Sequence, residues 1–247
     1  LGWMLAQTNT TKKVNGLQKG GLVAGVGAQV WPPEREERVF ELLGETEAHL
    51  LEHQKAVFGD FFESLTGGAF GRWKQCEWAF RADCTYVRVL EDRLDAGERT
   101  DLTALYLGGT DVVGHRFWAA HDPHAAGLAQ DCEEVRNFGH VIEDYYAWTD
   151  RALGRILARF PAETTVFVVS DHGMTLHPNL RGKVLTQEDL DGFTGHHVKR
   201  EPGIFLAAGP GIASATPAPA GGWTPEAVPT LGALYDFCPT LLALLAL

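Results

Sequence analysis

Short apolar runs alternate along the chain with longer stretches in which apolar residues recur every three or four positions. The runs are Leu102–Leu107, Thr164–Ser170 and Gly203–Ala208. Runs this short, and apolar on both faces, predict buried strands. The longer stretches predict helices beginning at Pro33 and over about 78–94, 137–160 and 234–247. Buried strands that alternate with helices predict an α/β fold, with a mostly parallel central sheet and helices on both of its faces.

The pattern also divides the chain into three regions. Residues 1–30 are poorly patterned and rich in glycine. Residues 31–100 hold only helical patterns and are interpreted as a helical insertion or cap. Residues 101–247 contain all three predicted strands, so this last region is expected to build the sheet.

Length and charge exclude several classes of protein. A chain of 247 residues that is 45% hydrophobic can bury a core of its own. Its net charge of −11 argues against a nucleic-acid-binding protein, although phosphates can still be bound if metal ions supply positive charge. No apolar run reaches the roughly 18 residues of a membrane span. The four cysteines form no C-x-x-C pair and are expected to be free, buried thiols.

Polar clusters of aspartate and histidine lie next to the predicted strands. They are Asp111–His115 after the first strand, Asp171–His172 after the second, and His196–His197 before the third. Sites in open parallel sheets form at the carboxyl ends of strands, so we expect these side chains to meet. Carboxylate oxygen together with imidazole nitrogen favours zinc or manganese over calcium. Each cluster alone could instead be a helix cap or a core histidine, and the other histidines, such as His140 and His177, are interpreted as structural.

The three motifs together resemble a known family. Tyr106-Leu-Gly-Gly-Thr-Asp111-Val-Val-Gly-His115, Val168-Val-Ser-Asp171-His172-Gly and Gly195-His-His197 are similar, in this order, to motifs of the type I phosphodiesterase/nucleotide pyrophosphatase family of the alkaline phosphatase superfamily. The resemblance covers about residues 100–247. It implies an alkaline phosphatase-like fold, two divalent metal ions, most readily zinc, with manganese as the alternative, and a small phosphoester substrate.

The resemblance also implies a role for each motif residue. Asp111, His115 and His197 match the ligands of one metal ion, with His196 as the alternative to His197. Asp171 and His172 match ligands of the other ion. Residues 101–247 would then be the C-terminal part of a metal-dependent hydrolase domain.

Two elements of the family have no visible match. The family completes its second metal site with an upstream aspartate and uses a threonine or serine nucleophile at a helix start, and neither is found here. We therefore expect a chain that lacks the N-terminal side of its catalytic domain, or a degenerate one, and no activity from the chain alone. A non-catalytic metal-binding protein and a sulfatase or phosphomutase relative remain as alternatives. No C/S-x-P-x-R run of the kind that sulfatases need occurs.

Overall fold

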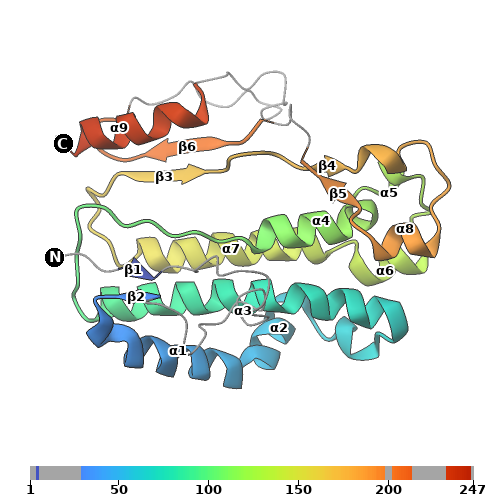
Figure 1. Ribbon diagram of the computed structural model, residues 1–247, viewed down its shortest axis with the longest axis horizontal. Coiled ribbons are helices and arrows are strands. Elements are labelled where there is room, and N and C mark those ends of the chain that lie inside the picture. The colour runs from blue at the N-terminus through green and yellow to red at the C-terminus, as the bar shows by residue number, and fades with distance from the viewer. Residues whose placement is uncertain (1–3, 6–28, 198–201, 213–231, 246–247) are drawn as a thin grey trace. The chain divides into compact units, whose positions relative to one another are not determined.

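The computed structural model describes residues 4–5, 29–197, 202–212 and 232–245. The chain divides into two compact units, which are described separately. Unit 1 consists of Leu1–Arg159 and Met174–Val198, and unit 2 of Phe160–Gly173 and Lys199–Leu247. Unit 1 holds most of the helices that Figure 1 shows, and unit 2 holds two strands and the last helix.

Unit 1 is built mainly from helices. Its longer helices are α1 (Glu36–Ala48), α2 (Leu50–Phe58), α3 (Gly67–Asp95), α4 (Gly109–His121) and α7 (Val141–Leu157). Shorter ones are α5 (Pro123–Ala126), α6 (Glu133–Phe138) and α8 (Gln187–Asp191), with 3-10 turns η2 (Pro33–Arg35), η3 (Phe61–Ser64) and η4 (Pro178–Leu180). Two small antiparallel sheets join β1 (Met4–Leu5) to β2 (Val30–Trp31), and β4 (Thr175–Leu176) to β5 (Gly195–His196).

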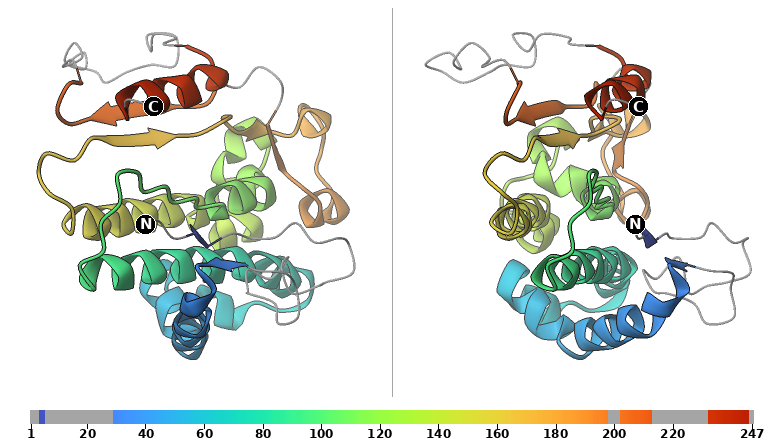
Figure 2. Two further views of the ribbon diagram at one scale, coloured as in Figure 1. Left: turned by 60° about the vertical axis from the view of Figure 1, so that its left-hand side comes forward. Right: turned by 90° about the vertical axis from the view of Figure 1, so that its left-hand side faces the viewer.

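The long helix α3 forms the centre of unit 1. Figures 1 and 2 show it between α1 on one side and the pair α4 and α7 on the other. Its buried Phe80 contacts the rings of Phe58, Tyr145 and Trp148, which come from α2 and α7. Burying this aromatic surface holds three helices together. Helix α4 packs against both α3 and α7, so this core fixes the position of α4.

Unit 2 contains a two-stranded sheet and a helix. Strands β3 (Val166–Val169) and β6 (Phe205–Ala208) pair antiparallel, with Val166 opposite Ala208. After the 3-10 turn η5 (Leu234–Asp236), α9 (Phe237–Leu244) packs on this sheet, because the ring of Phe237 lies 5.9 Å from that of Phe167 and 6.1 Å from that of Phe205. The strand side chains are half-buried or exposed.

The predicted parallel sheet is wrong for the part of the chain that the structure describes. All three two-stranded sheets there are antiparallel, and β3 has a partner on one side only. Leu102–Leu107 is not a strand, although its side chains alternate between more exposed and more buried positions. The chain is extended there, but no described segment forms a ladder with it. The strands β3 and β6 exist as predicted but are not buried on both faces.

The predictions based on local patterns fare better. Helices occur in every region where the apolar period predicts them, although α3 begins earlier and the 137–160 helix is divided between α6 and α7. No helix in the described residues is long and apolar enough to cross a membrane. All four cysteines are free, and Cys76 and Cys84 are buried as expected. The expectation of burial is wrong for Cys238, which is exposed on α9, and Cys132 is only partly buried.

Candidate metal centre

The first turns of α4 present an aspartate and a histidine on one face. Asp111 and His115 are four residues apart, a spacing that places side chains together on a helix. An oxygen of Asp111 lies 3.5 Å from Nε2 of His115. Both side chains are partly buried. The helix therefore offers one oxygen and one nitrogen ligand to the same point in space.

A hydrogen bond to the backbone fixes the orientation of the His115 ring. Its Nδ1 lies 2.8 Å from the carbonyl oxygen of Gly195 on β5. A carbonyl oxygen can only accept, so Nδ1 carries a proton and donates it, and Nε2 is the ring nitrogen that faces Asp111. Histidines that bind metals are usually held in this way, with the second ring nitrogen donating to a carbonyl or a carboxylate.

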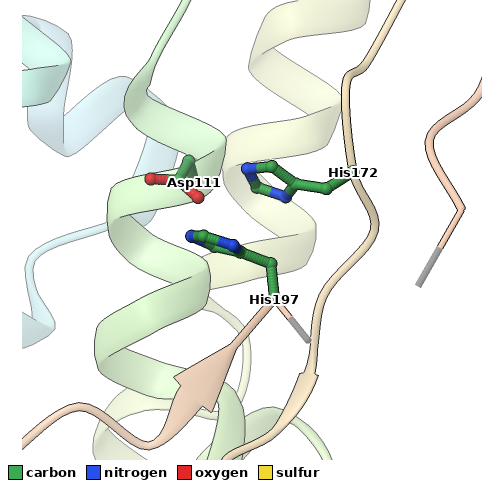
Figure 3. Close-up of side chains that lie close together, drawn as sticks. All are labelled: Asp111, His172 and His197. Atoms are coloured by element: carbon green, nitrogen blue, oxygen red, sulfur yellow. The ribbon is translucent and has the colours of Figure 1, made fainter. Parts of the chain in front are cut away.

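The residue after β5 brings a second histidine, His197, close to Asp111. A ring nitrogen of His197 lies within 4.8 Å of a carboxylate oxygen of Asp111. The His197 ring lies 5.1 Å from that of His115, whereas the His196 ring lies 6.5 Å away. Figure 3 shows Asp111 and His197 converging, and it also draws His172, which belongs to unit 2. Within unit 1, His197 is better placed than His196 to join Asp111 and His115.

Glycine and threonine in the Thr194–Gly195 segment let β5 approach α4 closely. A β-carbon on Gly195 would lie 2.2 Å from the carbonyl oxygen of Gly114, so only glycine fits there. The fully buried Thr194 donates from its hydroxyl to the carbonyl of Arg116, and its amide donates to the carbonyl of His115. The contact with the carbonyl of Gly114 explains the glycine at position 195, which lets β5 bring its histidines close to His115.

Unit 2 carries the second aspartate–histidine pair just after β3. Nε2 of His172 lies 3.7 Å from an oxygen of Asp171, and Nδ1 lies 3.0 Å from the carbonyl oxygen of Gly173. The ring is thus held by a backbone carbonyl, as His115 is. A β-carbon on Gly203 would lie 1.9 Å from the carbonyl oxygen of Ser170, so glycine is needed where β6 approaches the end of β3.

His177, which the sequence analysis interprets as structural, lies beside His196 in the structure. His177 follows β4, and its ring lies 4.9 Å from that of His196. Burial, together with the nearby His196 and His115, lowers the pKa of His177. The sequence signal is weak, because His177 and His196 become neighbours only through the pairing of β4 with β5, and these strands are far apart in the chain.

The donor set of unit 1 fits a divalent transition metal. Carboxylate oxygen and imidazole nitrogen are ligand types that zinc and manganese accept. The tautomer of His115 supports the same interpretation, since Nδ1 donates to a backbone carbonyl and Nε2 faces Asp111.

Comparison with known proteins gives one match. A family model described as Type I phosphodiesterase / nucleotide pyrophosphatase matches residues 2–218. The match begins well before the motifs that carry the resemblance and includes the predicted helical cap at 31–100. No curated protein and no solved structure matches the chain.

Proposed function

The chain belongs to the type I phosphodiesterase/nucleotide pyrophosphatase family, and from this premise we propose that it holds the metal ions of a phosphoester hydrolase. Asp111, His115 and His197 are proposed to bind the first ion. The observation that carries this assignment is the hydrogen bond from Nδ1 of His115 to the carbonyl of Gly195, which leaves Nε2 of the same ring beside Asp111.

The second ion is assigned to Asp171 and His172. What supports this is their position in the family motif and the hydrogen bond from Nδ1 of His172 to a backbone carbonyl. Zinc is the proposed metal at both sites, with manganese as the alternative, because each site combines carboxylate oxygen with imidazole nitrogen. The proposal assigns no nucleophile within these 247 residues.

The ligands are suited to a small anionic substrate. When bound, two divalent cations stabilise the attacking and leaving oxygens of a phosphoryl group during in-line displacement. The protein itself has a net charge of −11, so its side chains alone would repel a phosphoester.

The test is hydrolysis of bis(4-nitrophenyl) phosphate, compared with 4-nitrophenyl phosphate, by the full-length protein loaded with zinc or manganese. We expect metal-dependent hydrolysis that falls at least a hundredfold in Asp111→Asn, because this change removes a charged ligand and keeps the side-chain shape. A matched control is Asp95→Asn, which removes the same charge from an exposed ion pair with Arg159.

Two outcomes would contradict the proposal. One is a folded protein that binds metal ions but hydrolyses neither ester, which would indicate a non-catalytic member of the family. The other is hydrolysis that Asp111→Asn and Asp95→Asn lower equally, which would place the reaction away from α4.

A further inference from the structure

A buried carboxylate on α3 lies next to the start of α4, and the proposed function gives it no role. Asp83, in the middle of α3, is only 2% exposed. No ion pair within the described residues involves it. Burying a charge without a cationic partner costs free energy, so a buried carboxylate needs hydrogen bonds that offset this cost.

Asp83 accepts hydrogen bonds from two residues at the start of α4 and from one residue of α7. Its two oxygens accept from the amides of Gly108 at 3.2 Å and Gly109 at 2.9 Å, and one of them also accepts from the hydroxyl of Tyr145 at 2.9 Å. The residue at the N-cap of α4 is Gly108, which has no side chain to cap the helix. A carboxylate from α3 therefore caps α4, where the helix dipole favours a negative charge.

The packing around this cap is close. A β-carbon on Gly109 would lie 1.6 Å from the hydroxyl oxygen of Tyr145 and 2.7 Å from Oδ2 of Asp83. Tyr145 is fully buried on α7, with its ring against Phe80 and Trp148. The first residue of α4 is therefore held between α3 and α7.

The cap acts on the turn that carries the proposed ligands. Asp111 is the third residue of α4, two positions after Gly109, and His115 follows one turn later. We propose that Asp83, held by Tyr145, is a positioning residue that sets the direction of Asp111 and His115 toward a bound metal ion. This inference rests on the proposed metal site and extends it to two residues that touch neither the ion nor the substrate.

The pKa shifts of Asp83 and Tyr145 agree with this positioning role. Burial raises the pKa of Asp83 to about 6, although the hydrogen bonds from Gly109, Tyr145 and Gly108 oppose the rise. Burial and the adjacent carboxylate hold the pKa of Tyr145 well above its usual range. With the carboxylate ionised and the tyrosine protonated, all three donors are satisfied.

The test compares cobalt(II) binding by the native chain with binding by Asp83→Asn and Tyr145→Phe. Asparagine keeps the shape but cannot accept from both glycine amides and from Tyr145, and phenylalanine keeps the ring packing. The control is Glu91→Gln, a change on α3 about two turns from Asp83 that loosens contact with Arg155 of α7 and not with α4. Cobalt(II) absorption in the visible range reports ligand geometry directly.

We expect Asp83→Asn and Tyr145→Phe to fold and to bind cobalt(II) at least tenfold more weakly, with an altered visible band, while Glu91→Gln matches the native chain. Native affinity and a native spectrum in either folded variant would overturn the inference, as would equal weakening in Glu91→Gln. If Asp83→Asn does not fold, Tyr145→Phe decides by the same criteria. If the native chain binds no cobalt(II), the proposed metal site itself is wrong. If the native chain binds cobalt(II) and the variants bind it equally well, only the positioning role of Asp83 and Tyr145 is wrong.

Discussion

The backbones of Gly195 and Gly114 touch: a β-carbon on Gly195 would lie 2.2 Å from the carbonyl oxygen of Gly114. Through this contact β5 meets α4, and the carbonyl of Gly195 accepts the hydrogen bond that orients His115. The site is therefore assembled by close packing of two glycines as well as by its own ligands.

Gly195→Ala should disturb both the fold and the site. The added methyl group must push β5 away from α4, which costs about 1–3 kcal/mol of unfolding free energy. We also expect about tenfold weaker zinc binding, because the partner of His115 moves. Urea unfolding of the metal-free chain and zinc titration measure the two effects. Gly154→Ala is the control, since nothing lies within 4 Å of its β-carbon on the exposed side of α7, and it should stabilise the protein by about 0.5–1 kcal/mol.

The pKa of Asp83 predicts a dependence of stability on pH. Its value rises from 3.8 to about 6 on folding, so the folded state holds this proton more tightly than the unfolded state. The contribution of the protonated group is complete below about pH 4 and is lost as the pH rises through 6. The unfolding free energy of the native chain, minus that of Asp83→Asn, should therefore fall between pH 4 and 6, by on the order of 3 kcal/mol at most. A difference that is flat or rises with pH would show that folding does not raise the pKa of Asp83.

The ion pair between Arg72 and Glu134 should matter far more than ion pairs on the surface. Both side chains are buried, at 4% and 8% exposure, and the guanidinium donates to both carboxylate oxygens at 2.9 and 2.7 Å. Glu134→Ala leaves the positive charge buried and should cost about 3–5 kcal/mol in urea unfolding. Glu63→Ala, which breaks the exposed pair with Lys55, should cost less than about 1 kcal/mol. Equal losses in the two variants would contradict this account of α3 and α6.

Asp171→Asn tests the assignment of the second ion. The change removes a charged ligand and keeps the side-chain shape, so bound zinc should fall from two ions toward one in the full-length protein, with hydrolysis largely lost. Elemental analysis after dialysis measures the stoichiometry. Two ions and undiminished activity in Asp171→Asn would mean that Asp171 is an ordinary polar residue at the end of β3.

Local patterns predicted the helices, and non-local pairing made the predicted sheet wrong. The capping box that starts α8 involves only Thr186 and Asp189, which lie three positions apart, so it is a feature that local sequence can specify. The partner of β3 is instead β6, antiparallel and more than thirty residues away, which no local pattern indicates. Leu102–Leu107 is as apolar as a buried strand, yet Leu102 and Tyr106 are 51% and 74% exposed.

The candidate site residues could be named from the sequence because their motifs are short, and their role as ligands stays a prediction. Asp111 and His115 share a helix face through spacing alone, and the resemblance to the family favours His197 over His196. The residues that hold the start of α4 in place could not be predicted from the sequence. Asp83 and Tyr145 lie on other helices, and only the packing of α3 and α7 against α4 brings them to Gly109.

The central claim is that Asp111, His115 and His197 bind one metal ion. Anomalous X-ray diffraction at the zinc absorption edge, on crystals of the chain grown with zinc, tests it most directly. The account predicts an anomalous peak within about 2.0–2.2 Å of a carboxylate oxygen of Asp111, Nε2 of His115 and a ring nitrogen of His197. Zinc bound at other residues, with no peak between these three side chains in a folded protein, would contradict it.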